Sequence, residues 1–243
     1  MNNNTISYIY SILIYIIPLL LLTGSFLPDL AISLLALSFI FIIYKKKMYH
    51  YFNNRFFYFF LYFSLFLCIC SIFSENIVNS LETSFVYIRF SIFALVVWYV
   101  IENNKNFLKF FTYFFISIFI LALIDGYIQF FLDRNIFGLI NSWDSSTRLT
   151  LTFNDSLILG GYLARFLPFL IGLIILNVAN NKLMIFLTCS LLILTDILIY
   201  LSGERTAMAL LVISTVMIII LLSRFNLIRL ITFILSIIII ILF

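Results

Sequence analysis

Residues 183–201 read LMIFLTCSLLILTDILIYL, an apolar stretch in which Asp196 is the only charged residue. An α-helix rises about 1.5 Å per residue, so a helix over this stretch would be about 28 Å long. That length is close to the hydrocarbon core of a bilayer, which is about 30 Å thick. The stretch therefore predicts a transmembrane helix.

Similar apolar stretches recur throughout the 243 residues of the chain. They predict eight full spans and a ninth that begins near residue 230. The eight lie at about residues 6–23, 27–44, 56–73, 84–101, 107–124, 157–176, 183–201 and 207–222. We therefore predict an all-α fold, a polytopic transmembrane helical bundle that forms a single domain over residues 1–243.

The composition agrees with this fold class. Hydrophobic residues make up 65% of the chain and charged residues 10%, whereas a soluble domain carries about 25% charged residues. A separate soluble domain is therefore excluded. The apolar stretch after Arg229 would form a helix of only about 21 Å. We therefore expect a truncated ninth span and a chain that is the front portion of a longer protein or of a split gene.

Basic residues gather in alternate connections between the predicted spans. They are Lys45, Lys46, Lys47, Arg55, Lys105, Lys109, Lys182, Arg224 and Arg229. Under the positive-inside rule these connections face the cytoplasm. The multi-pass chain would then have a cytoplasmic N-terminus, and residues 125–156 would form an extended loop on the outer side. Loops of this length in compact folds are usually functional or disordered.

Four arginines are expected near that outer side. Arg89 and Arg165 lie inside predicted spans, Arg148 in the long loop, and Arg205 in the turn at 202–206. Charged residues inside a membrane are rare and need a partner or a wet cavity. Guanidinium groups bind phosphate oxygens in a planar, two-pronged geometry. We therefore expect the four to converge on an outward-facing cavity that holds a diphosphate.

A second anion-binding element is expected at residues 202–206, because this turn opens the eighth helix with unbonded backbone N–H groups. Glu204 and Asp196 would support the site, as would Asp155, the expected N-cap of the sixth span. The alternative is that the arginines are structural and neutralised by nearby carboxylates. The candidates for that role are Asp125, Asp196, Glu82 and Glu204.

Short motifs for metal ions and nucleotides are missing from the sequence. It has no Walker loop, no GxGxxG, no paired-aspartate metal motif and no Cys/His cluster. The single His50 follows the cytoplasmic lysines, so it is a poor candidate for outward-facing chemistry. We expect no metal ion, no cofactor, no assignable catalytic residue and no nucleic-acid partner.

Three segments carry a resemblance to a known family. They are RLTLTFNDS at 148–156, GGYL at 160–163 followed by Pro168, and LSGERTA at 201–207. The chain resembles the O-antigen ligase and polymerase superfamily of bacterial envelope glycosyltransferases. In that family an Arg-x-x-Gly-x-Phe type segment leads into a helix, and a Ser-x-x-Arg turn opens a later one. The resemblance covers the whole chain, which corresponds to the front half to two thirds of a typical member.

The resemblance implies a glycosyltransferase of the bacterial inner (cytoplasmic) membrane that acts in lipopolysaccharide or other envelope polysaccharide biosynthesis. It would transfer or polymerise glycans from an undecaprenyl-diphosphate donor at the periplasmic face, without metal or nucleotide. Arg148 and Arg205 match the family's arginine motifs and would hold the diphosphate. The implied partners are the lipid-linked glycan, membrane lipid, and a separately encoded or missing C-terminal portion.

Two departures from the family pattern affect the expected activity. The family glycine after the first arginine is replaced by the stretch Leu149, Thr150, Leu151. The family's large periplasmic loop, which supplies the His taken as general base, would follow residue 243. General-base catalysis contributes about 10²- to 10⁴-fold, so we expect this chain alone to be inactive or nearly so.

Two other functions fit the sequence. In a multi-span transporter or lipid flippase, Asp196, Asp125 and the arginines would form a substrate or proton path without glycosyl transfer. A non-catalytic membrane scaffold is the third possibility.

Overall fold

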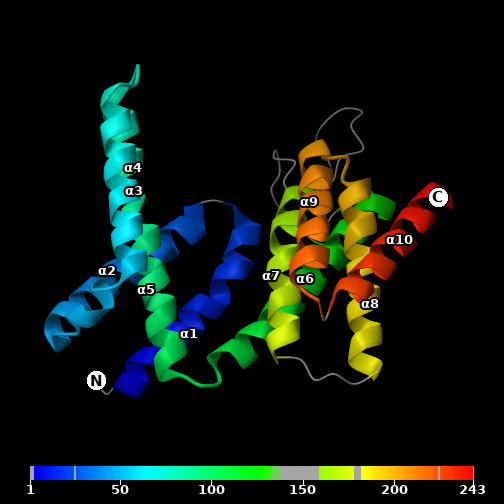
Figure 1. The fold of residues 1–243 in the computed structure, drawn as a ribbon, viewed down its shortest axis with the longest axis horizontal. Coiled ribbons are helices and arrows are strands. Elements are labelled where there is room, and N and C mark those ends of the chain that lie inside the picture. The colour runs from blue at the N-terminus through cyan, green and yellow to red at the C-terminus, as the bar shows by residue number, and fades with distance from the viewer. Residues whose placement is uncertain are drawn as a thin grey trace. The chain divides into compact units, whose positions relative to one another are not determined.

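The computed structural model describes residues 3–24, 26–132, 134, 136, 159–177, 182–223 and 225–242 (Figure 1). Every regular element in these ranges is a helix, which confirms the all-α prediction. The helices are α1 (Asn3–Leu20), η1 (Leu21–Thr23), α2 (Phe26–Lys46), η2 (Tyr49–Phe52), α3 (Arg55–Ile72), α4 (Ile77–Val86), α5 (Ile88–Asn103), α6 (Phe107–Leu132), α7 (Leu159–Asn177), α8 (Lys182–Leu201), α9 (Arg205–Leu221) and α10 (Asn226–Leu242).

Within the described residues, 7 helical segments are long and apolar enough to cross a membrane. They are α1 with η1, then α2, α3, α4 joined to α5, α6, α7 and α8. Helices α9 and α10 are equally apolar, but each has 17 residues and is only about 26 Å long. The chain is therefore a multi-span membrane protein, and the predicted eight full spans and truncated ninth correspond to seven long helices and two shorter ones.

Two predicted boundaries differ from the structure by more than four residues. Helix α4 begins at Ile77, so the fourth span starts earlier than residue 84, and the helix is interrupted at Tyr87. Helix α6 continues to Leu132, so residues 125–132 of the predicted loop are helical. Asp125 and Gln129 lie one turn apart on α6 and are 6% and 2% exposed. Both side chains are buried within the helix, although the sequence placed the start of the loop at Asp125.

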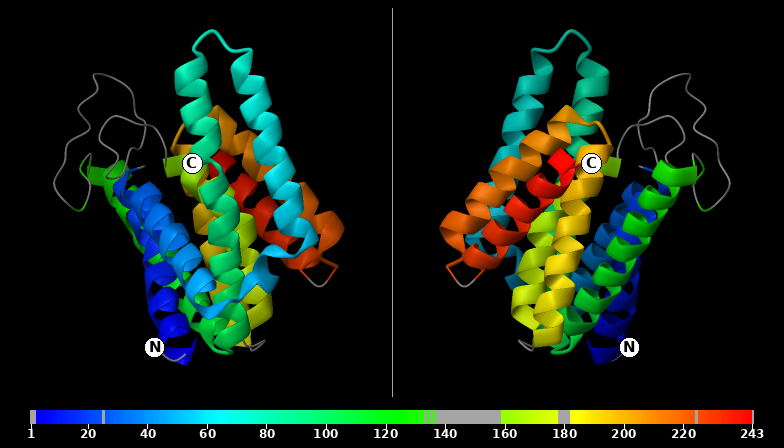
Figure 2. Two further views of the ribbon diagram at one scale, coloured as in Figure 1. Left: turned by 90° about the vertical axis from the view of Figure 1, so that its left-hand side faces the viewer. Right: turned by 90° about the vertical axis from the view of Figure 1, so that its right-hand side faces the viewer.

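The chain divides into two compact units. The N-terminal unit covers Met1–Leu21 and Ser25–Phe107, and the C-terminal unit covers Leu22–Gly24 and Leu108–Phe243. In the N-terminal unit, α5 packs against α1 and α2 around the aromatic rings of Tyr10, Phe39, Tyr51 and Tyr99. Helices α3 and α4 lie side by side, as both views of Figure 2 show, and the Ser71 and Ser84 hydroxyls are 2.6 Å apart between them.

In the C-terminal unit, α7 packs against α8 and α9, and α10 packs against α8 and α9. Helix α6 contacts α7 through aromatic rings, with the Phe115 centroid 5.6 Å from that of Phe166 and 5.4 Å from that of Phe169. Helix α10 runs obliquely to α8 in Figures 1 and 2. In Figure 1, α9 ends and α10 begins well above the lower end of α8. The short α9–α10 pair therefore places its turn inside the length of the neighbouring helices.

Candidate functional site

The turn from α8 to α9 is built from the sequence Ser202-Gly203-Glu204. Helix α8 ends at Leu201, and Gly203 has a φ of 69°, a left-handed conformation that glycine adopts without steric cost. Ser202 is fully buried, and its hydroxyl donates to the Ile199 carbonyl at 2.7 Å. The turn is therefore fixed, and α9 begins directly after it at Arg205.

Glu204 joins the start of α9 to the start of α7. Its Oε1 accepts a hydrogen bond from the Gly160 backbone N–H, and its Oε2 accepts one from Gly161, both at 2.9 Å. The first N–H groups of a helix lack intrahelical partners and attract negative charge. The carboxylate therefore occupies the anion-binding end of α7, and two motifs that are far apart in the sequence form one structural element.

Gly160 is required by the close packing at this point. A Cβ atom at residue 160 would collide with the Ser202 hydroxyl and would lie 3.1 Å from the Ala207 Cβ. The 160–161 glycine pair therefore allows the α7 backbone to approach the α8–α9 turn. The resemblance drew attention to these glycines, but only the structure gives the reason for them.

Arg205 and Arg165 both belong to this part of the C-terminal unit. Arg205 is exposed at the first position of α9. Arg165 is also exposed and lies one turn along α7 from Gly161, about 6 Å along the helix axis. Neither guanidinium makes an ion pair with a described residue. Glu204 accepts from the α7 N–H groups and forms no ion pair with Arg205 or Arg165, so both described guanidinium groups are exposed without a carboxylate bonded to them.

Arg89 lies in the N-terminal unit and has a different environment. Its guanidinium pairs with Asp29 of α2 at 2.8 Å and donates to the Ser33 hydroxyl at 3.1 Å. Asp29 was not among the carboxylates that the sequence suggested as neutralising partners. Arg89 is therefore neutralised by a carboxylate, as expected if its role is structural. Arg148 and Asp155 lie outside the described residues, so the convergence of four arginines stays a prediction.

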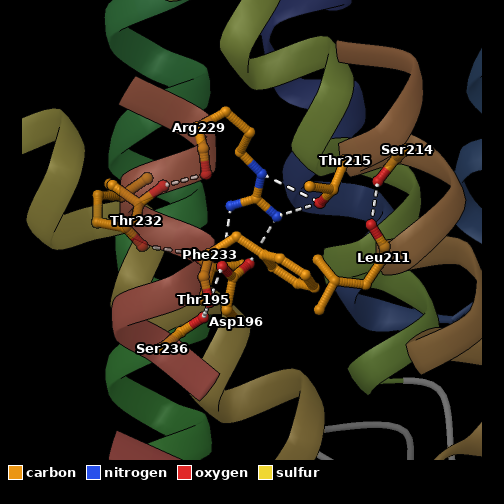
Figure 3. A network of polar contacts seen from close by, with 10 residues as sticks. Thr195, Asp196, Leu211, Ser214, Thr215, Arg229, Thr232, Phe233 and Ser236 are labelled. Atoms are coloured by element: carbon orange, nitrogen blue, oxygen red, sulfur yellow. Dashed lines mark hydrogen bonds and ion pairs between the residues drawn. The ribbon is translucent and has the colours of Figure 1, made fainter. Parts of the chain in front are cut away.

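Asp196 was among the carboxylates expected to neutralise an arginine, but its partner Arg229 and the buried network around them were not predicted from the sequence (Figure 3). Arg229 was assigned to a cytoplasmic connection, but it lies in α10 and has no exposed surface. Its NH1 and NH2 donate to the two Asp196 carboxylate oxygens at 2.9 and 3.0 Å. The Thr215 hydroxyl accepts from both Nε and NH2, and Ser236 donates to Asp196 at 3.2 Å. Asp196 is thus engaged in linking α8 to α10.

A sequence signal for this network existed. Arg229, Thr232 and Ser236 are spaced by three and four residues, which places them on one face of a helix. All three are buried. A polar stripe in an otherwise apolar helix predicts a face turned toward the bundle interior. This signal was overlooked because the stretch after Arg229 was interpreted as a truncated span.

The remaining candidate carboxylate, Asp125, accepts a hydrogen bond from the Ile136 backbone N–H at 2.7 Å. It forms no ion pair with a described residue. Within the described ranges, no group of three His, Cys, Asp or Glu side chains could hold a metal ion. The candidate site among the described residues is therefore the exposed Arg205 at the N-terminus of α9, a position suited to binding an anion.

Comparison of the chain with family models, with curated proteins and with solved structures finds no match.

Proposed function

We propose that this protein is an O-antigen ligase- or polymerase-like glycosyltransferase of the bacterial cytoplasmic membrane. It would have a cytoplasmic N-terminus and would act on undecaprenyl-diphosphate-linked glycans at the periplasmic face. The observation that carries the proposal is the α8–α9 turn, where Glu204 is held by the α7 N–H groups while Arg205 stays exposed. This turn is the element that resembles the family's Ser-x-x-Arg motif.

The electrostatics of the turn favour a diphosphate as ligand. Arg205 stands at the N-terminus of α9, where the helix dipole adds positive potential. Among the described residues, the backbone N–H groups of Arg205 and Thr206 have no hydrogen-bond partner. Arg165 adds a second guanidinium about one turn from the α7 glycines. Because Glu204 is already bound to α7, an incoming anion would not have to displace it from Arg205.

In the proposed reaction, an acceptor hydroxyl oxygen bonds to the anomeric carbon of the donor glycan. The bond from that carbon to the diphosphate oxygen breaks, and the diphosphate leaves with the electron pair. Guanidinium and backbone N–H groups aimed at the leaving group stabilise its developing charge. The hydroxyl proton passes to a base, a role that we assign to none of the described residues.

The transporter alternative has less support. In a transporter, Asp196 would form part of the path that a substrate or proton follows. In the structure both Asp196 oxygens accept from Arg229, and Ser236 donates to one of them. A carboxylate that accepts three hydrogen bonds within a buried ion pair is poorly placed to bind and release a transported ion.

A binding measurement on the purified chain tests the proposal. Undecaprenyl diphosphate is titrated into the protein in detergent micelles, and the affinity is compared with that of Arg205→Gln. A hydrogen bond to a charged group contributes about 1.5–3 kcal/mol, so the variant should bind about tenfold more weakly or worse. Undecaprenyl monophosphate should bind the unmodified chain more weakly than the diphosphate, because it offers fewer oxygens to Arg205 and Arg165.

Arg55→Gln is the matched control, since Arg55 is exposed at the start of α3 in the N-terminal unit. It should bind the diphosphate like the unmodified chain. Equal affinities of all three proteins, or no binding of the diphosphate by any of them, would remove the proposed site.

A further inference from the structure

An apolar groove runs along the C-terminal unit between α6 and α8, with a volume of about 850 Å³. Its α6 wall extends from Tyr113 to Leu132, its α8 wall from Met184 to Leu194, and Ile174 of α7 also lines it. The α6 wall is about 28 Å long, nearly the thickness of a hydrocarbon core. Since α6 and α8 are both membrane-length helices, the groove lies at the depth of lipid acyl chains.

Three of the four hydroxyl side chains along the groove donate hydrogen bonds to backbone carbonyls, and the fourth, Tyr113, lies near the start of α6. Thr188 donates to the Met184 carbonyl at 2.8 Å, and Ser190 donates to the Phe186 carbonyl at 3.0 Å. Tyr127 of α6 donates to the Leu194 carbonyl at 2.8 Å. The protons of these three hydroxyls are therefore used, and the other side chains along the middle of the groove are apolar. The middle of the groove is therefore suited to a hydrocarbon and not to a polar headgroup.

Both helices run in the same direction along the groove. Asn177 at the end of α7 donates to Thr112 near the start of α6 at 2.9 Å. Helix α8 begins at Lys182, five residues after Asn177. At the other end, a Cβ on Gly126 of α6 would lie 2.7 Å from Leu198 of α8. The starts of α6 and α8 therefore lie at one end of the groove.

That end carries two exposed lysines. Lys109 lies one turn before Tyr113 on the same face of α6, and Lys182 lies two residues before Met184. Neither makes an ion pair with a described residue. The described acidic residues on the two helices are distant, since Asp125 is about 24 Å beyond Lys109 and Asp196 about 21 Å beyond Lys182 along the helix axes. Among the described residues of α6 and α8, this end of the groove therefore carries positive charge and no carboxylate.

We propose that the α6–α8 groove is a binding site for an anionic phospholipid. One acyl chain would lie in the groove, and the phosphate headgroup would contact Lys109 and Lys182. A methylene group occupies roughly as much space as a water molecule, about 30 Å³, so a chain of 16 carbons needs roughly 500 Å³ and fits. The lysines fix which end the headgroup occupies, and the side chains can reach the membrane surface while their stems stay apolar.

The test uses a tryptophan placed in the groove and quenched by brominated lipid. In the full chain, Trp98→Phe and Trp143→Phe remove the native tryptophans, and Ile120→Trp adds a reporter about 10 Å along α6 from Tyr113. The protein is reconstituted into phosphatidylcholine vesicles that contain brominated phosphatidylglycerol or brominated phosphatidylcholine. We expect a relative binding constant of about fivefold or more in favour of phosphatidylglycerol, since each lysine near the surface contributes about that factor.

Adding Lys109→Gln and Lys182→Gln should reduce this preference toward unity. Lys45→Gln with Lys46→Gln is the matched control, because these lysines end α2 in the N-terminal unit, and it should keep the preference. High salt should weaken the preference in the unmutated groove, because exposed charges are screened. The salt dependence is measured without a lysine substitution, so it does not depend on how the lysine variants fold.

Two results would overturn the proposal. Equal quenching by the two brominated lipids would mean ordinary boundary lipid without headgroup recognition. Absence of quenching by either lipid would mean that a protein segment, such as a helix of a second copy, covers the groove. Both outcomes are independent of diphosphate binding at Arg205.

Discussion

Asp196 and Arg229 are a charged pair with 1% and 0% of their side-chain surface exposed. Removing charges from water is unfavourable, so such a pair is tolerated only when geometry and further hydrogen bonds compensate. Thr215 and Ser236 supply those bonds from α9 and α10. One polar cluster therefore joins α8, α9 and α10 at a fixed position along their lengths.

We predict that Arg229→Met alone destabilises the protein by about 3–5 kcal/mol, because it leaves the Asp196 carboxylate buried without a cation. The double variant Arg229→Met with Asp196→Leu should recover most of that loss, since no unpaired charge remains. Reversible unfolding in mixed micelles measures both free energies of unfolding. A double variant that is as unstable as the sum of the two single variants would contradict this assignment.

At the scale of elements, the contact between α7 and α9 depends on the small size of Gly160. A Cβ there meets the side chains of Ser202 in the α8–α9 turn and of Ala207 in α9, whereas a Cβ at Gly172 of the same helix has nothing within 4 Å. The two glycines therefore differ in purpose although both lie in α7. Gly160 permits close packing, whereas Gly172 has open space beside it.

We predict that Gly160→Ala destabilises the protein by about 1–3 kcal/mol, the usual effect of forcing an extra group into a packed contact. Gly172→Ala should leave stability unchanged or raise it by up to about 1 kcal/mol, because alanine is the better helix former. Thermal unfolding of the two variants beside the unmodified chain measures the difference. Equal effects of the two substitutions would show that the α7–α9 approach is not as tight as described.

The positions of the helices could be predicted because the bilayer sets the length of each apolar stretch. The partners of the charged residues could not, because hydropathy does not say which face of a helix meets which neighbour. Arg229 shows this limit: its place beside a predicted span boundary suggested a loop, while its bonds to Asp196 come from helix packing. Glu204 and Gly160 were both noticed, but a separation of 44 residues hid their contact.

At the scale of the whole molecule, the proposed function requires the α8–α9 turn to face the outside of the cell. The positive-inside rule predicts this, since the connection that holds Lys45 to Lys47 and the start of α8 at Lys182 would both be cytoplasmic. Seven membrane-length helices are compatible with that arrangement and with its inverse. The orientation is therefore the property on which the location of the chemistry depends.

Single cysteines placed in an otherwise cysteine-free chain can determine the orientation of the chain in the membrane. We predict that Glu75→Cys, between α3 and α4, and Thr206→Cys, at the start of α9, react with a membrane-impermeant maleimide on intact cells. Lys105→Cys, between α5 and α6, should react only after permeabilisation. All three positions are exposed, so reactivity reports the side of the membrane, and the cysteine-free chain gives the background. The reverse pattern would place Arg205 in the cytoplasm, where a periplasmic glycan donor could not reach it.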